Sequence, residues 1–154
     1  CALPGPEPTA ERFTRMTLAA TTQDCWFDGK AHLLHLQRHR DARGCLLPLE
    51  FDQLPFAPQR LFTVSEADPG TQRGGHGHRR GQQLLVCLAG RIDVALQCGS
   101  ERAEVTLDSN GPALLVSAGV WGEQTYVEQH SVLLVLASDP YDASSYFLQG
   151  EPAP

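Results

Sequence analysis

The chain has 154 residues, of which 42% are hydrophobic, and a formal net charge of -6 at pH 7. A chain of this length suffices for one ordinary domain, and no apolar run is long enough to span a membrane. The negative charge excludes a protein whose whole surface binds nucleic acid, because such a surface needs an excess of cations to displace phosphate counterions. We therefore expect a single soluble domain that binds neither nucleic acid nor a membrane.

The N-terminal part of the chain is rich in proline. Residues 1–30 are interpreted as a tail or linker with an N-terminal extension, which is compatible with fusion to an upstream domain. Because the chain begins at Cys1, a processed lipoprotein is an alternative, and Met16 is a candidate natural start. The five cysteines have no metal-type spacing and are typical of reduced, mostly buried thiols, so a cytoplasmic protein is expected.

Apolar runs of strand length, each followed by turn residues, recur from residue 31 onward. This pattern favours an all-β sandwich or barrel over residues 31–148, with residues 149–154 as a C-terminal tail. Tyr141 and Tyr146 are expected to close the end of the barrel. The runs with their turn residues are 45–51, 60–70, 82–90, 91–99, 103–111, 112–119, 124–129 and 131–140.

Two histidines lie at a regular spacing between these runs. Gly70, His76, His78, Gln83 and Gly90 reproduce the first motif of the cupins, G-x5-H-x-H-x(3,4)-E-x6-G, with glutamine in place of the glutamate. Alternate residues of a strand point to the same face, so His76 and His78 are predicted to point together into the barrel.

A metal site at these histidines would lack ligands. The second cupin motif keeps its spacing from Gly111 onward, but Gly122 occupies the position where a histidine belongs. Two imidazoles and the Gln83 amide are fewer good ligands than divalent ions usually need. We therefore expect no metal and no other cofactor. The two imidazoles are instead predicted to transfer protons, because imidazole titrates near neutrality.

Over most of its length the chain resembles the WxcM-like cupins, a family of nucleotide-linked sugar 3,4-ketoisomerases that act on dTDP-4-keto-6-deoxyglucose. The resemblance implies a cupin double-stranded β-helix, also called a jelly roll, and a homodimer. It also implies an isomerase that moves the keto group from C4 to C3 in deoxysugar biosynthesis. The matching segments are 41–44, 55–62, 73–78, 83–90, 120–124 and 131–147.

The implied reaction takes a proton from C3 and returns a proton to C4 through an enediolate. The resemblance makes His78 the base and His76 the neighbour that orients or stabilises the substrate. A positioned base contributes about a hundredfold to ten-thousandfold, and the negative charge of the enediolate needs fixed donors as well. Arg73 is the candidate donor.

Of four further polar side chains, Arg60 and Gln83 are candidates for holding the dTDP-linked substrate. Arg60 suits the pyrophosphate, because guanidinium groups bind it through paired hydrogen bonds. Arg79 and Arg80 are interpreted as solvated loop charges. Gln83 is predicted either to bond a sugar hydroxyl or to satisfy a buried backbone group.

Three more candidate contacts come from other segments. Trp121 either stacks on the thymine or sugar or belongs to the core. Glu123, in the same matching segment, is a further candidate contact. Arg43 is either a turn residue bonded to Asp41 or a substrate contact from an exchanged N-terminal segment.

The chain departs from the family at three positions near this predicted site. Phe62 and Thr63 stand where tyrosine is frequent, and Gly122 stands where histidine is frequent. These changes remove hydrogen-bonding groups. Two alternatives therefore stay open: a non-catalytic cupin module that binds a nucleotide sugar, and a dTDP-sugar epimerase.

Residues 31–50 are expected to add a strand to the sheet of a partner in a homodimer. Their apolar side chains are too many for a loose surface segment, and an open sandwich has edge strands that must be covered. Twofold dimers are the commonest soluble oligomers. The alternative is that the segment folds back onto its own barrel.

Overall fold

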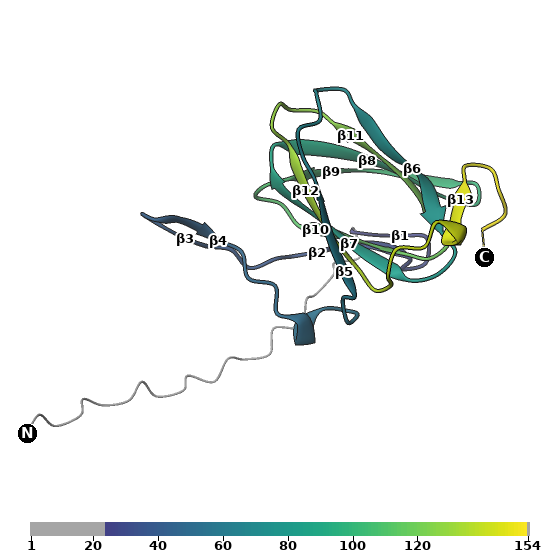
Figure 1. Ribbon diagram of the computed structural model, residues 1–154, viewed down its shortest axis with the longest axis horizontal. Helices are drawn as coiled ribbons and strands as arrows, with labels where there is room; N and C mark the ends of the chain where they lie inside the picture. Colours follow the sequence, from purple (N-terminus) through teal and green to yellow (C-terminus); the bar gives the residue numbers. More distant parts are fainter. Residues whose placement is uncertain (1–23, 154) are drawn as a thin grey trace, which may run out of the picture.

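The computed structural model describes residues 24–153, which form strands, two short 3-10 helices and loops. All neighbouring strands are antiparallel, and the two large sheets form two facing layers (Figure 1). This arrangement confirms the predicted all-β jelly roll. The six-stranded sheet has the order β1 (Cys25–Trp26), β2 (Ala31–Leu34), β10 (Ala113–Ser117), β7 (Gln82–Ala89), β12 (Val132–Ala137) and β5 (Arg60–Val64), and the five-stranded sheet has the order β13 (Tyr146–Leu148), β6 (Gln72–His78), β11 (Trp121–Tyr126), β8 (Arg91–Cys98) and β9 (Glu101–Asp108).

The main core lies between the two sheets, because the strands alternate between apolar and polar residues. β8 and β9 pair along their whole length, and Ile92, Val94 and Leu96 of β8 are buried together with Val105 and Leu107 of β9. Between them, Asp93 and Thr106 are exposed and Ala95 is half-buried. Each fully buried aliphatic side chain contributes roughly 1.5–3 kcal/mol to folding.

The central strand β7 is buried on both faces. Leu85 and Cys87 face the core between the sheets, whereas Leu84 and Val86 belong to a second apolar cluster on the other face. Leucines and a phenylalanine within residues 47–56 pack on this second cluster. This covering segment explains why β7 contains four consecutive buried residues instead of an alternating pattern.

The predicted strand at residues 45–51 is therefore only partly present. Its first two residues belong to β4 (Gly44–Leu46), and the remainder crosses the outer face of the six-stranded sheet as a loop. A 3-10 helix, η1 (Phe51–Gln53), follows. Pro48 lies in this segment and has no N–H to donate to a sheet ladder, which disfavours a central strand.

The six-stranded sheet begins before residue 31, where the sequence predicted the start of the domain. Cys25 lies opposite His32 in the β1–β2 pair, and Phe27 is 7% exposed within the main core. Residues 24–30 therefore belong to the folded unit. The tail or linker was predicted over residues 1–30, and its residues 1–23 lie outside the described range. Fusion to an upstream domain stays a prediction.

A hairpin projects from the two sheets between β2 and η1 (Figure 1). It consists of β3 (His39–Asp41) and β4, which pair only with each other. Arg38 fixes its base, since the guanidinium Nη1 donates a hydrogen bond of 2.7 Å to the carbonyl oxygen of Gly111. β2 itself pairs with β10 of the same chain.

The prediction of mostly buried thiols is wrong for the described cysteines. Cys25 and Cys45 are exposed, Cys98 is half-buried and Cys87 is buried, and all four are free thiols. Burial raises the pKa of the Cys87 thiol to about 11. In the range 24–153, no helix has the length and apolar character needed to cross a membrane.

Close packing at Gly77 predicts a clear effect on folding. A Cβ at this residue would lie 2.2 Å from a ring carbon of Phe147 and 2.7 Å from the carbonyl oxygen of Val120. Gly77→Ala is therefore expected to lower the free energy of unfolding by roughly 1–3 kcal/mol, as overpacking usually does. Urea denaturation followed by fluorescence measures this change.

Gly111→Ala is the matched control, because its Cβ would make an ordinary contact of 3.4 Å with Asp108. The stability of this variant should be unchanged or slightly raised, since alanine reduces the entropy of the unfolded chain. Equal stabilities for the two variants would contradict the packing described for β6 and β13.

Candidate active site

A cavity of about 180 Å³ lies between the two sheets and receives side chains from both. One part of its lining is apolar and the other part is polar, which suits a ligand with both kinds of group. The apolar lining consists of Phe62, Val64, Leu85, Val94, Leu96, Val116, Val120, Leu133 and Val135, and the polar lining consists of Arg60, Arg73, His76, His78, Gln83, Gln124 and Tyr146.

Strand β6 carries the histidines into this cavity. His76 and His78 both line it, as the alternation along a strand predicts, and their ring centroids are 5.2 Å apart. The carbonyl oxygen of Gly74 lies 3.1 Å from Nδ1 of His76. Because a carbonyl only accepts, His76 Nδ1 is the donor in this contact, and Nε2 is the ring nitrogen left for a ligand.

A β-bulge brings Arg73 to the same face as the histidines. Gly122 of β11 lies opposite His76, but the next residue, Glu123, lies opposite Gly74, so Gly75 is the extra residue of β6. Gly74 and Gly75 have φ values of +87° and +73°, which side chains with a Cβ rarely adopt. Strict alternation would have placed Arg73 on the opposite face.

Tyr146 completes the histidine pair from the C-terminal strand. β13 pairs with β6 so that Tyr146 lies opposite His78. The Tyr146 ring stacks on His76 with centroids 4.0 Å apart, and it meets His78 edge-on at 4.9 Å. The predicted role of Tyr146 was to close the barrel, and its packing against both imidazoles was not foreseen.

Burial lowers the pKa of His78 to about 4. Electrostatic interactions with His76 and Arg60 lower this pKa as well, and the Asp139 carboxylate raises it. His78 is therefore a neutral imidazole at physiological pH. A neutral imidazole in a partly apolar cavity can accept a proton from a bound carbon acid.

Arg60 lies between two aromatic rings at the edge of the cavity. Its guanidinium carbon is 4.5 Å from the centroid of Phe62 and 4.9 Å from the centroid of Tyr141. Cation–π contacts of this kind orient the guanidinium without using its N–H donors. The donors stay available for an anion.

A smaller cavity of about 40 Å³ adjoins the main one, and both are lined by His78, Arg60, Gln83 and Tyr146. Asp139 is among its further lining residues. Its volume is sufficient for an ordered water molecule. His78 therefore stands between the larger cavity and a polar space that contains a carboxylate.

The two arginines that follow His78 are exposed to solvent, as predicted, but both also bind groups of the C-terminal segment. Arg80 binds the Asp142 carboxylate, which also accepts a hydrogen bond of 2.9 Å from the backbone N–H of Ser144 and so caps the second 3-10 helix, η2 (Ala143–Ser145). Arg79 donates a hydrogen bond of 3.1 Å to the carbonyl oxygen of Pro152. Both arginines therefore fix the C-terminal segment that carries Tyr146.

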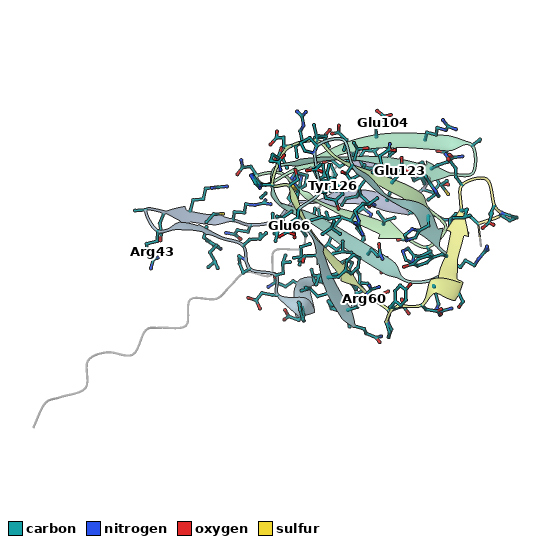
Figure 2. The ribbon with its side chains drawn as sticks, turned by 45° about the horizontal axis from the view of Figure 1, so that its top comes forward. Arg43, Arg60, Glu66, Glu104, Glu123 and Tyr126 are labelled. Atoms are coloured by element: carbon teal, nitrogen blue, oxygen red, sulfur yellow. The ribbon has the colours of Figure 1, made fainter. Side chains whose placement is uncertain are left out.

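Three of the predicted contact residues lie away from the cavity. Trp121 is only 8% exposed, and neither it nor Glu123 is among the described residues that line the cavity. The Glu123 carboxylate lies against the bulge, 3.6 Å from the position of a Cβ at Gly75. Arg43 lies on the projecting hairpin, far from Arg60 in Figure 2, and its backbone N–H donates a 2.8 Å hydrogen bond to Asp41.

The donor set of the cavity is unlike a metal centre. Over residues 24–153, no three side chains of His, Cys, Asp or Glu are grouped as metal ligands would be.

Gln124 and Asp139 belong to the site, although the sequence did not lead us to predict them. The alternation along β11 from Gly122 contained the information for Gln124, whereas the position of Asp139 depends on a loop.

The pKa of His78 can be measured directly. In the free protein the imidazole should stay neutral down to about pH 4, because burial and cationic neighbours disfavour its protonated form. Asp139→Asn should lower this pKa further, since the carboxylate is the group that raises it. NMR titration of the ring Cε1–H of His78 follows both changes.

Asp142→Asn is the matched control, because Asp142 lines the same small cavity but its carboxylate is already bonded to Arg80 and Ser144. This variant should leave the pKa of His78 unchanged. A His78 pKa at or above the ordinary value of 6.5 would contradict the electrostatics described here.

Comparison with known proteins places the chain in a family. The family model described as FdtA, WxcM-like, C-terminal, matches residues 29–151. A TDP-4-oxo-6-deoxy-alpha-D-glucose-3,4-oxoisomerase of Aneurinibacillus thermoaerophilus is 35% identical over 118 residues, which cover 76% of this chain and 85% of that protein.

Two solved structures have the same fold. QdtA, a sugar 3,4-ketoisomerase from Thermoanaerobacterium thermosaccharolyticum in complex with TDP, is 30% identical with a TM-score of 0.74, and the match covers 79% of this chain and 89% of that one. The WlaRB TDP-quinovose 3,4-ketoisomerase of Campylobacter jejuni is 32% identical with a TM-score of 0.72, and the match covers 77% and 92%. The chain therefore belongs to the WxcM-like family of FdtA.

Proposed function

We propose that the protein is a 3,4-ketoisomerase that acts on a dTDP-4-keto-6-deoxyhexose. The observation that carries this proposal is the neutral His78 beside His76 and Tyr146 in a cavity with both apolar and polar lining. The 3,4-oxoisomerase from A. thermoaerophilus and the two solved ketoisomerases support the same reaction and a TDP-linked substrate.

His78 acts as the base in this proposal. It takes the proton from C3 of the sugar, and the carbonyl at C4 becomes the oxyanion of an enediolate. The proton of the C3 hydroxyl then moves to the oxygen at C4, and His78 returns its proton to C4 as the new carbonyl forms at C3. One imidazole can serve both carbons because they are adjacent. His76 orients the sugar through its Nε2, since its Nδ1 is bonded to the Gly74 carbonyl.

The protonated form of His78 must be stabilised during this step, because the free protein disfavours it. The pyrophosphate of the substrate neutralises Arg60, and the enediolate adds a negative charge beside the new imidazolium. Both effects raise the pKa of His78 when substrate is bound. Asp139 acts in the same direction from the smaller cavity.

Polar side chains of the main cavity stabilise the enediolate. Arg73 reaches the cavity from β6 because of the bulge, and Gln124 lies opposite it on β11. Gln83 enters from β7 and is available to a sugar hydroxyl. Fixed donors aimed at a developing oxyanion are the largest contribution in many enzymes.

Incubation of EDTA-treated protein with dTDP-4-keto-6-deoxyglucose in deuterated water tests the reaction. We expect deuterium at C4 together with a new 3-keto product, observed by NMR. Exchange at C5 would instead indicate an epimerase. The absence of any exchange, with binding retained, would indicate a non-catalytic module.

His78→Asn is the decisive variant in the same assay, because an amide fills the space but cannot carry the proton. Turnover should fall by at least about a hundredfold while TDP binding is kept. Arg73→Ala should weaken both binding and turnover. Near wild-type turnover of His78→Asn would move the role of base to His76.

We also propose a homodimer in which part of residues 31–50 pairs with the partner. The hairpin β3–β4 is the part of this segment that its own two sheets leave unpaired. Exposed apolar side chains lie near the hairpin at Leu46 and Phe51 and on the edge strand β5 at Leu61. In this proposal Arg43 of the hairpin approaches the partner's site. Exposed free thiols at Cys25 and Cys45 support a reducing compartment such as the cytoplasm.

Light scattering at micromolar concentration tests the dimer, with twice the chain mass as the expected result. Leu61→Glu should shift the population toward the monomer, because it places a charge on the edge strand that the partner covers. Leu148→Glu, at an equally exposed leucine of the other sheet, is the control. The mass of one chain for the unmodified protein would reject the dimer.

A further inference from the structure

Ser145 brings a buried hydroxyl to the smaller cavity. The residue is 5% exposed, and its Oγ has no hydrogen-bond partner among the described residues. Trp121 and Tyr126 also have a buried polar atom without a described partner, but neither of them lines this cavity. Because buried hydroxyls usually have a hydrogen-bond partner, we expect the partner of Ser145 within the cavity.

Asp139 is fixed at the wall of the same cavity. Its Oδ2 accepts a hydrogen bond of 2.6 Å from the Ser138 hydroxyl and lies against Gly81, where a Cβ would overlap it. Its Oδ1 stays available to a further donor. The influence of Asp139 on His78 is electrostatic, without a direct hydrogen bond between the two described side chains.

A water molecule fits between these groups. A cavity holds an ordered water when its volume exceeds about 10–15 Å³ and when two to four polar partners surround it. This cavity has a volume of about 40 Å³, and its lining includes the His78 imidazole, the Asp139 carboxylate and Ser145. An ionised carboxylate only accepts, so such a water directs one proton to Asp139 and keeps its lone pairs for donors.

We infer that one ordered water in the smaller cavity joins His78 to Asp139 and Ser145, and that these two residues thereby fix the tautomer of the base, an inference that rests on the proposed function. His78 lines both cavities, so its two ring nitrogens serve different partners. The nitrogen that faces the water keeps its proton and donates it. The other nitrogen then presents its lone pair to the sugar, as a base must.

Ser145 and Asp139 are positioning residues in this inference, because they act through His78 and do not touch the sugar. The tautomer of His78 is measured in the free protein from the nitrogen chemical shifts of its ring at pH 7, where the imidazole is neutral. One tautomer should dominate in the unmodified protein.

Two variants should convert this single tautomer into a mixture. Ser145→Ala removes one partner of the water, and it should fold normally because it removes no hydrogen bond to another side chain. Asp139→Asn introduces an amide that donates to the water and so reverses the direction of the hydrogen bonds. Ser144→Ala is the matched control, since Ser144 is exposed and is not part of the cavity lining, and it should keep the single tautomer.

Turnover of dTDP-4-keto-6-deoxyglucose tests the contribution of the water to the proposed reaction. Ser145→Ala should lower kcat by about twofold to tenfold, the effect of one neutral hydrogen bond, while KM and TDP affinity stay unchanged. Asp139→Asn should lower kcat by about tenfold or more, because hydrogen bonds to charged groups are stronger. The double variant should lose no more than Asp139→Asn alone, since both residues act through the same water.

Three outcomes would overturn the inference. They are a mixture of tautomers in the unmodified protein, a single tautomer kept in both Ser145→Ala and Asp139→Asn, and a loss of TDP affinity in Ser145→Ala as large as its loss of kcat. The NMR measurement needs no substrate. A single tautomer that is lost in Ser145→Ala, together with no turnover by the unmodified protein, would therefore reject the proposed function and keep the water site.

Discussion

The extra residue in β6 decides which side chains reach the cavity. A regular strand without the bulge at Gly74 and Gly75 would direct only every second side chain toward the cavity, and Arg73 would face away from His76 and His78. The inserted residue interrupts the alternation between Arg73 and the histidines, so all three side chains line one cavity. Two neighbouring glycines with positive φ make the bulge possible, because other residues adopt this conformation only with strain.

The same strand is fixed on both edges, by β11 on one side and by β13 on the other. This double pairing sets the imidazoles at a defined distance from Tyr146. It also buries Gly77 of β6 against Phe147 of β13. Burial then controls the chemistry of His78, because its imidazolium is costly in this environment. The imidazole of His78 has a pKa of about 6.5 in the unfolded chain and about 4 in the folded protein. Between these two pH values the unfolded chain binds a proton that the folded protein does not, so the free energy of unfolding decreases as the pH falls through this range.

The sequence predicted the features that depend on local spacing. Strand alternation in β8 and β9, the two histidines on one face, and the cavity position of Gln83 follow from a period of two residues. The sequence did not predict the features that depend on pairing between distant strands. The stacking of Tyr146 on His76 requires the register of two strands about seventy residues apart in the chain, which no local pattern contains. Trp121 illustrates the same limit, since its type suits either a core or a ligand site and only the tertiary structure distinguishes them.

A base whose pKa is as low as that of His78 is weak in the free protein, and this weakness has a consequence for specificity. Burial is the largest cause of this low pKa, and a ligand that supplies negative charge near Arg60 would compensate one of the smaller causes. A neutral keto sugar that lacks a pyrophosphate would leave Arg60 uncompensated, and the imidazolium would stay disfavoured. In the proposed function, Arg60 binds the anion and so couples anion binding to the activation of the base. In the proposed function, the part of the substrate that does not react therefore contributes to the chemical step, because its negative charge favours the protonated form of His78.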